Sequence, residues 1–448
     1  MKRARLGGFL LFLLGSFLFV AVGGIKEHIS GSMCDFKNSY YAGRCLLQHC
    51  DPYRSRELQA VYLAEGGDHP TNSLVGVVST YVNFPTSFTF MGPLALLPWG
   101  PAHVLWMILT VGCMICAAFL IWKIGANYAP LVTGSLTCFL LATSVWLLLV
   151  GNPSGVVVGL TVVAACCFVK ERFVWVGILC LAISLLIRPH DAGLVWLYFL
   201  LAGKVYRKCA LQTLLFVVVL GLPGILWVSH VAPHWEKELQ SDLATCSASG
   251  GACDPGPNSP GGHDADFLIN LQTAISVFWD NSHIYNPVTY LLCGPLLLIW
   301  IITTLRARAS ATSAWLALAA IVTLSMLPLY HRQHDTRLLL LAFPACAMLW
   351  AEGGLVGWFA VVLNSAGVVL SGDISSAIRI RLIWNVLASA SGFPFKLLTV
   401  VLGRPIPLIL LIMCIFYLWA YIRHTFNRSA STDAFPAARF HLKNQARV

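Results

Sequence analysis

The chain has 448 residues, of which 58% are hydrophobic and 11% are charged, and it carries a formal net charge of +10. Soluble domains are about 45–50% apolar and about 25% charged, so this composition excludes an ordinary soluble fold. A helix needs about 20 apolar residues to cross a hydrocarbon core about 30 Å thick, and apolar runs of that length recur along the whole chain. A transmembrane β-barrel would show alternating segments of about ten residues instead. We therefore expect an all-α, polytopic transmembrane helical bundle.

The apolar runs predict about 12 membrane spans, with a range of about 11–13. The first, at 6–23, is expected to be a retained helix rather than a signal peptide, because no convincing small-residue cleavage site follows it. The ambiguous stretch 382–402 holds Pro394 and Lys396 and is interpreted as interfacial or re-entrant. If it crosses the membrane, the higher count applies and the C-terminal tail lies outside. The candidate spans are residues 6–23, 103–122, 129–150, 153–169, 173–187, 191–203, 209–229, 287–305, 312–330, 338–351, 354–370 and 405–422.

Basic residues gather at alternate ends of these spans, which is the pattern that the positive-inside rule predicts. A cytoplasmic N-terminus places two long loops, about 24–88 and 230–286, on the outer face of the membrane. Residues 1–422 then form a single multi-span membrane domain with short interfacial helices, and the basic tail 423–448 lies in the cytoplasm. Most of the positive charge therefore orients helices, and no nucleic-acid partner is expected. The basic clusters at the expected cytoplasmic ends are Lys123, Lys170 with Arg172, Lys204 with Arg207 and Lys208, and Arg306 with Arg308.

Five of the 15 cysteines lie in the two long outer loops. An oxidising compartment permits disulfides there. Cys45 with Cys50, and Cys246 with Cys253, are candidate local pairs, but pairing does not follow from sequence and reduced thiols are the alternative. No Cys/His spacing is typical of a zinc site, and we expect neither a metal nor another cofactor.

Polar residues collect on the expected outer face in four groups, and the first directly follows the first span. It begins with Asp35. A carboxylate just outside the membrane can accept the proton of a hydroxyl and make it a nucleophile, so Asp35 is the candidate general base. The alternative is a solvated loop acid. The candidate acceptor-lining residues of this group are Tyr40, Tyr41, Arg44, Asp51 and Tyr53.

The second group is an apolar segment broken by prolines, which includes Asn83 and extends to Pro98. It is interpreted as a segment at the membrane interface. It either meets a lipid substrate or serves as a surface anchor with aromatic belt residues. Asn83 is its candidate substrate-lining residue.

The third and fourth groups bring guanidinium and imidazole side chains to the same face. Such donors suit a phosphate or pyrophosphate, and charge near a membrane is costly unless it is paired or functional. The alternative is a set of headgroup anchors and mutual ion pairs. Asn152 adds a candidate substrate-lining amide. The candidate phosphate ligands are Arg188, His190, His331, Arg332, His334 and Arg337.

Short motifs within these groups follow one another in a fixed order. They are Asp35-Phe36, Tyr40-Tyr41-Ala42-Gly43-Arg44, Asp51-Pro52-Tyr53, Asn83-Phe84-Pro85, Gly92-Pro93-Leu94-Ala95-Leu96-Leu97-Pro98, Gly151-Asn152 and Ile187-Arg188-Pro189. This order resembles the family-87 glycosyltransferases, which include polyprenyl-phosphate-mannose-dependent α-mannosyltransferases of the multi-span GT-C architecture. The resemblance covers about residues 5–350. Each motif is short and weak by itself, so the order of the motifs is what is specific to the family.

The resemblance implies inverting transfer of a hexose, with mannose as the first choice, from a polyprenyl-phosphate sugar donor to a lipid or glycan acceptor. The reaction would take place on the outer face of a bacterial inner membrane. The resemblance assigns Asp35 as general base, matches Arg188 to a lysine of the family and matches Asn152 to a glutamine. The family's late histidine falls on either His331 or His334.

Other classes of function stay open. A transporter or flippase of a lipid-linked saccharide would use the same cations, but it should carry paired broken helices and ionisable residues at mid-membrane. A polymerase or ligase with a pyrophosphate donor would share the topology, and a non-catalytic scaffold would not need Asp35. The collection of polar residues on one face favours an enzyme. The Cys-rich first loop and a Gly/Pro-rich insert at 246–262 depart from the family and leave the acceptor open.

Overall fold

The computed structural model describes residues 2–30, 33–67, 78, 80–256, 268–308, 310–382 and 392–433. Within these ranges every regular element is a helix, and the one pairing of extended backbone is an isolated bridge between Leu268 and Arg332. The expected all-α fold is confirmed.

Six described helices are long and apolar enough to cross a membrane, so the chain is an integral membrane protein. The number is seven if α17 (Gly354–Leu370) and α18 (Asp373–Leu382), which meet at a 67° bend, form one span. The six are α1 (Lys2–Ser30), α5 (Trp99–Gly125), α6 (Pro130–Ala142) continued by α7 (Val145–Val150), α11 (Lys204–Val231), α14 (Ser282–Arg306) and α20 (Pro405–Asp433).

Shorter helices pack among the long ones, and they decide how many spans are counted. Their 10 to 16 residues reach only about 15–24 Å, less than the hydrocarbon core. The expected total of about 12 counts such helices, so it stays a prediction. The expected span at 338–351 is divided between the 3-10 helix η3 (Gln333–Ala342) and an α-helix. The shorter helices are α8 (Ser154–Val169), α9 (Val174–Ile187), α10 (Pro189–Leu201), α15 (Ala311–Ser325) and α16 (Phe343–Glu352).

Helices α1 and α6 pack with almost no space between their backbones. A Cβ on Gly134 would lie 2.5 Å from the carbonyl oxygen of Gly8, and a Cβ on Gly15 would lie 2.5 Å from the Cα of Cys138. Small residues at such contacts let membrane helices approach closely, which increases the van der Waals contact between them. This contact fixes the first span against the centre of the bundle.

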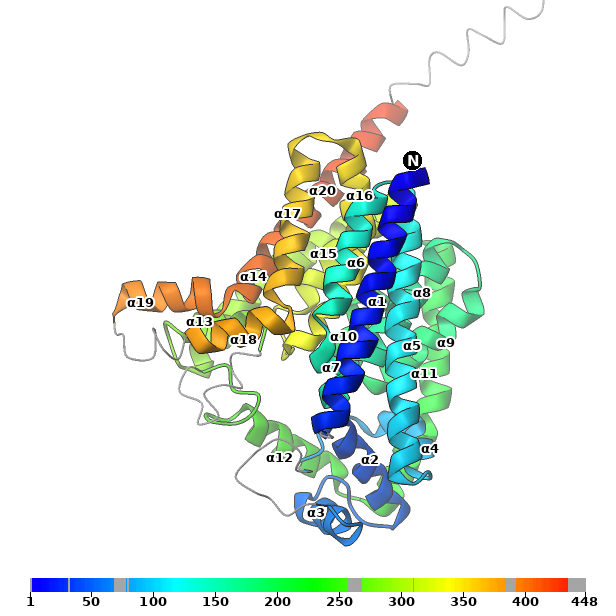
Figure 1. The fold of residues 1–448 in the computed structure, drawn as a ribbon, viewed down its shortest axis with the longest axis vertical. Helices are drawn as coiled ribbons and strands as arrows, with labels where there is room; N and C mark the ends of the chain where they lie inside the picture. The colour runs from blue at the N-terminus through cyan, green and yellow to red at the C-terminus, as the bar shows by residue number, and fades with distance from the viewer. Residues whose placement is uncertain are drawn as a thin grey trace, which may run out of the picture.

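We call the end of the bundle away from the N-terminus the distal end. Figure 1 shows α2, α3 and α12 gathered there, beyond the last turn of α1. The short helices outside the long bundle are α2 (Cys34–Leu47), α3 (Ser55–Ala64), η1 (Pro85–Ser87), α4 (Phe88–Ala95), α12 (Trp235–Ser247), α13 (Leu271–Ser276), α19 (Phe393–Leu398) and the π-helical η5 (Thr399–Gly403).

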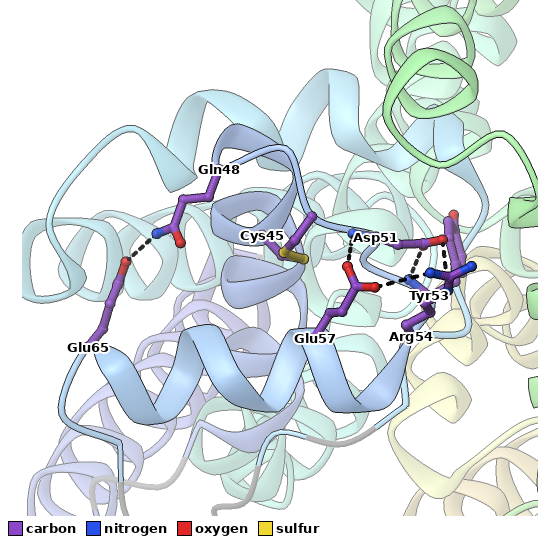
Figure 2. Close-up of a disulfide and its surroundings, with 8 residues drawn as sticks. Cys45, Gln48, Asp51, Tyr53, Arg54, Glu57 and Glu65 are labelled. Carbon is purple, nitrogen blue, oxygen red and sulfur yellow. Dashed lines mark hydrogen bonds and ion pairs between the residues drawn. A yellow bond between two sulfur atoms is a disulfide. The ribbon is translucent and has the colours of Figure 1, made fainter.

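Both candidate disulfides are present at the distal end. Cys45 is bonded to Cys50, and Cys246 is bonded to Cys253. Figure 2 shows the first of these beside the loop that joins α2 to α3. Disulfides persist in oxidising compartments; that this end faces outward stays a prediction.

Three expected segments lie partly outside the described residues. In 382–402, residues 383–391 are not described, while the flanking α18 and α19 run across the bundle axis (Figure 1), in agreement with an interfacial course. In the insert 246–262, residues 257–262 are not described. In the tail 423–448, α20 continues to Asp433 and 434–448 are not described.

We predict that Gly134→Ala lowers the melting temperature of the protein in detergent. The new methyl group would meet the α1 backbone at 2.5 Å, and overpacking of this kind costs about 1–3 kcal/mol. Gly112→Ala in α5 is the matched control, because a Cβ there meets nothing within 4 Å. Equal melting temperatures for the two variants would contradict the close α1–α6 contact.

Candidate functional site

A cavity of about 380 Å³ lies at the distal end, where several separate parts of the chain meet. Its volume is within the range of about 300–1,000 Å³ that is typical of small-molecule sites. The cavity wall is partly polar and carries both acids and cations. The charged and amide residues that line it are Asp35, Asn38, Asn83, Asn152, Arg188, Asp242 and Arg332.

The start of α2 is held against the bundle by an aromatic contact. The Phe36 ring is fully buried and stacks on the Trp106 ring of α5, with the ring centroids 4.8 Å apart. The indole N–H of Trp106 donates a hydrogen bond of 2.8 Å to the carbonyl of Gly151. These two contacts fix the neighbouring Asp35, in the first turn of α2, beside the turn between α7 and α8.

Asn152 joins the expected base to the rest of the site. Gly151 ends α7 in the left-handed conformation with φ of 64°, and a Cβ there would lie 2.9 Å from Phe36. Glycine adopts this conformation without strain. The turn aims the Asn152 amide at Asp35, and its N–H₂ donates a hydrogen bond of 2.6 Å to the carboxylate. The other end of the amide accepts a hydrogen bond of 3.2 Å from Arg188.

Arg188 lies at the break between α9 and α10. Pro189 has no backbone N–H and disfavours helical backbone in the residue before it, and Arg188 accordingly has φ of −145° and ψ of 85°. The break ends α9 at the distal end and aims the Arg188 side chain into the molecule, where it is 8% exposed and lines the cavity. Arg188 thus occupies a charged break between two short helices.

Two buried carboxylates hold the Arg188 guanidinium. Its Nη1 atom lies 2.9 Å from Asp335 Oδ1 and 3.3 Å from Asp191 Oδ2. The Ser154 hydroxyl contacts both Arg188 and Asp335. Buried charges of this kind are tolerated only when they are paired and hydrogen-bonded. Ser154, Asp191 and Asp335 therefore determine where Arg188 points.

The late histidines differ in their charge. His331 is fully buried, and its Nδ1 atom lies 3.2 Å from Asp335 Oδ2 and 3.3 Å from Asp191 Oδ1. Burial favours its neutral ring, but the contacts with the two carboxylates outweigh burial and raise the pKa of His331 to about 9. Burial lowers the pKa of His334 to about 4, so that ring is neutral at pH 7. His331 and Arg188 together balance the charges of the two carboxylates.

Arg332 forms another part of the cavity wall. Its backbone N–H donates a hydrogen bond of 2.8 Å to Asp335, and its side chain contacts the Tyr330 hydroxyl. Its Nη2 atom also donates a hydrogen bond of 3.2 Å to the carbonyl of Ala252. Ala252 lies in the loop that the Cys246–Cys253 disulfide closes. This loop and Arg332 therefore contact each other in the cavity wall.

The structure places five expected acceptor-lining residues outside the cavity wall, in the layer that supports it. Tyr40 donates to the carbonyl of Leu97, and Tyr41 packs edge-on against Tyr62. Figure 2 shows Asp51, Tyr53 and Glu65 around the loop that follows α2. The contacts there are Arg44 with Glu65 at 2.6 Å, the Tyr53 hydroxyl with the carbonyl of Asn83 at 2.9 Å, and the Tyr53 N–H with Asp51 at 3.0 Å.

Arg337 lies in a different place from the other expected phosphate ligands. Its side chain is 2% exposed and lies 3.2 Å from Asp373, at the bend between α17 and α18. It also donates to the carbonyls of Thr143 and Ser371. These contacts tie the bend to the end of α6. Of the expected phosphate ligands, Arg188 and Arg332 line the described cavity, whereas Arg337, His190, His331 and His334 do not.

Sequence reasoning did not assign several polar residues that the structure places in or beside the site, and four of them are charged or contact Arg188. Asp191 and Asp335 are next to expected site residues in the sequence, and acids beside cations near a membrane are a signal that could have found them. Ser154 and Asp242 carry no such signal. Asp242 lines the cavity from α12, and burial, followed by the nearby Glu238, raises its pKa to about 6.

We expected no Asp-x-Asp pair in the sequence, and that expectation was wrong. An Asp-x-Asp pair, a common metal-binding pattern in sugar transfer, is present at Asp264 and Asp266. It lies outside the described residues, so the structure does not relate it to the cavity.

Comparison of the chain with protein-family models, with curated proteins and with solved structures gives no match. The geometry of the site is therefore the basis for any functional proposal.

We predict that Asp335→Asn lowers the free energy of unfolding by about 3 kcal/mol, because it leaves buried Arg188 without its nearest carboxylate. Glu65→Gln is the control, since it breaks the Arg44 pair, whose side chains are 31% and 24% exposed, and such pairs contribute less than about 1 kcal/mol. Reversible denaturation of both variants in detergent measures the difference. Equal losses would show that the buried network does not hold these helices together.

Proposed function

We propose that this protein is a membrane glycosyltransferase that transfers a hexose, with mannose as the first choice, from a polyprenyl-phosphate sugar to a lipid or glycan acceptor. The proposal includes membership of the family-87 group, a GT-C architecture of about 12 spans, and an active face outside a bacterial inner membrane. Asp35 is the general base, and Arg188 and Arg332 bind the donor phosphate.

The observation that carries the proposal is that one cavity presents a carboxylate and two guanidinium groups. Asp35, Arg188 and Arg332 all line it, and Asn152 bridges the first two through hydrogen bonds of 2.6 and 3.2 Å. A base and anion-binding groups in one cavity wall are what transfer from a sugar phosphate to a hydroxyl requires.

The proposed reaction is a single displacement. Asp35 accepts the proton of the acceptor hydroxyl, and the oxygen attacks the anomeric carbon. The bond from that carbon to the phosphate oxygen breaks on the opposite side, its electron pair leaves with the polyprenyl phosphate, and the configuration inverts. The Arg188 and Arg332 guanidinium groups stabilise the charge that develops on the phosphate.

The main alternative is a flippase or transporter of a lipid-linked saccharide. The break at Arg188-Pro189 is a feature that transporters also have. The ionisable residues, however, lie at helix ends rather than in the middle of spans: Arg188 joins α9 to α10, and Asp335 begins η3. This one-sided arrangement favours an enzyme.

The test uses purified protein in lipid nanodiscs, radiolabelled polyprenyl-phosphate-mannose and a membrane extract as acceptor. We predict that Asp35→Asn reduces label transfer by at least about 100-fold, which is the usual contribution of a general base. Glu236→Gln is the matched control, because it removes an exposed carboxylate of α12 outside the cavity wall. It should transfer label at the wild-type rate.

The variants distinguish the possible outcomes. Transfer by Asp35→Asn at the wild-type rate would contradict the assignment of the base. If Asp242→Asn lost activity instead, the base would be Asp242, the other acid in the cavity wall, whose pKa is raised by burial. Movement of the intact donor between leaflets, without transfer of label, would favour the flippase.

A further inference from the structure

Behind Arg188, two histidines and an aspartate bring three potential metal ligands together. His190 and Asp191 begin α10, and His331 lies just before η3. Their ligand atoms all lie within 4.8 Å of one another. This cluster is separate from Asp35 and Asn152, and Asp191 is the member that contacts a residue of the proposed reaction, through its ion pair with Arg188.

The separations of these atoms suit a metal ion. Asp191 Oδ1 lies 3.3 Å from His331 Nδ1 and 3.5 Å from His190 Nε2. Zinc binds nitrogen and oxygen ligands at about 2.0–2.2 Å in tetrahedral geometry, which places neighbouring ligand atoms roughly 3.4 Å apart. An ion would therefore fit among the three atoms with small side-chain shifts.

Unsatisfied polar atoms provide an independent observation. The Asp191 side chain is fully buried, and its Oδ1 atom contacts the two histidine rings at 3.3 and 3.5 Å without a well-aligned hydrogen bond. The Nε2 atom of His190 is also buried and makes no well-aligned hydrogen bond in the described part of the chain. Buried polar groups are almost always satisfied, so this poorly satisfied contact between a carboxylate oxygen and a ring nitrogen is one that a shared cation would satisfy.

Removal of the His331 proton leaves the site with a negative charge that a cation can balance. Asp335 is the second carboxylate here, 3.2 Å from His331 Nδ1. When His331 is neutral, Asp191, Asp335 and Arg188 sum to one negative charge. Metal binding and protonation of a histidine are alternatives, because the ligand must present its lone pair to the ion. An ion at this position would replace the proton of His331, and Asp335 would keep its contacts with Arg188 and the Arg332 N–H.

The donor set selects the class of ion. Two imidazoles and one carboxylate suit zinc and the neighbouring first-row divalent metals, whereas magnesium and calcium prefer sites made of oxygen atoms. His190 is 32% exposed, so the site is open to solvent on one side. Three protein ligands leave a coordination position for water or an anionic oxygen.

We propose that His190, Asp191 and His331 form a binding site for one zinc-like divalent cation beside Arg188. The site stands on its own contacts and does not depend on glycosyl transfer. Sequence inspection could not find it, because its ligands come from two distant segments and match no regular metal-binding spacing.

The test measures zinc binding directly. The protein is purified without a polyhistidine tag, placed in nanodiscs and stripped with a chelator, and zinc is then titrated against a chromophoric competitor. Wild type should bind one high-affinity zinc ion per chain. His190→Ala should weaken the dissociation constant by at least about tenfold, because it removes one of three ligands. His234→Ala, which removes an exposed histidine at the start of α12, should bind zinc like wild type.

Cobalt provides a second readout. The visible absorption of wild type loaded with Co²⁺ should show the bands of a nitrogen- and oxygen-ligated ion, and His190→Ala should lose them. If stripped wild type takes up no zinc, or if His190→Ala binds zinc as tightly as His234→Ala, the site does not exist. Both outcomes are independent of whether the protein transfers sugar.

Discussion

The buried contact between Arg188 and Asp335 is the constraint on which the distal end depends. A guanidinium at 8% exposure is tolerated only because Asp335 and Asp191 lie within 3.3 Å of it. Arg188 belongs to the α9–α10 break, whereas Asp335 belongs to η3, 147 residues later in the chain. Neither segment can move away without leaving an unpaired charge in a low-dielectric interior. The ion pair therefore fixes how these short and otherwise apolar helices pack.

This constraint extends to the expected catalytic group through Asn152. The amide receives a hydrogen bond from Arg188 and donates one to Asp35. Aromatic packing of Phe36 on Trp106 holds α2 in position from the other side. Asp35 is therefore the last member of a chain of contacts. The buried Arg188–Asp335 ion pair contacts the Asn152 amide, the amide contacts Asp35, and Asp35 lines the cavity. Such preorganisation is what stabilisation of a developing charge requires, because the donors need not reorganise during the reaction.

The sequence predicts the helical membrane fold and the meeting of Asp35, Asn152, Arg188 and Arg332, because positive charges and apolar runs indicate which loops share a face. It offers both disulfides only as candidate pairs, because pairing does not follow from sequence. It does not predict which residues of a loop face the cavity. Tyr40 and Tyr41 belong to the same predicted outer-face group as Asp35. In the structure, however, α2 places their side chains in a buried aromatic layer instead of the cavity wall. The sequence also does not predict that Asp335 pairs with Arg188, because the two residues come together only when distant helices pack.

The most direct test of the account is whether the cavity recognises a phosphate on a lipid. Binding of polyprenyl phosphate and of uncharged polyprenol, which share the same chain, would be compared by competition against labelled polyprenyl phosphate on wild-type protein in nanodiscs. The account predicts that polyprenyl phosphate binds at least about tenfold more tightly, because charge-assisted hydrogen bonds from Arg188 and Arg332 hold the phosphate. Equal affinity for the two lipids would contradict it.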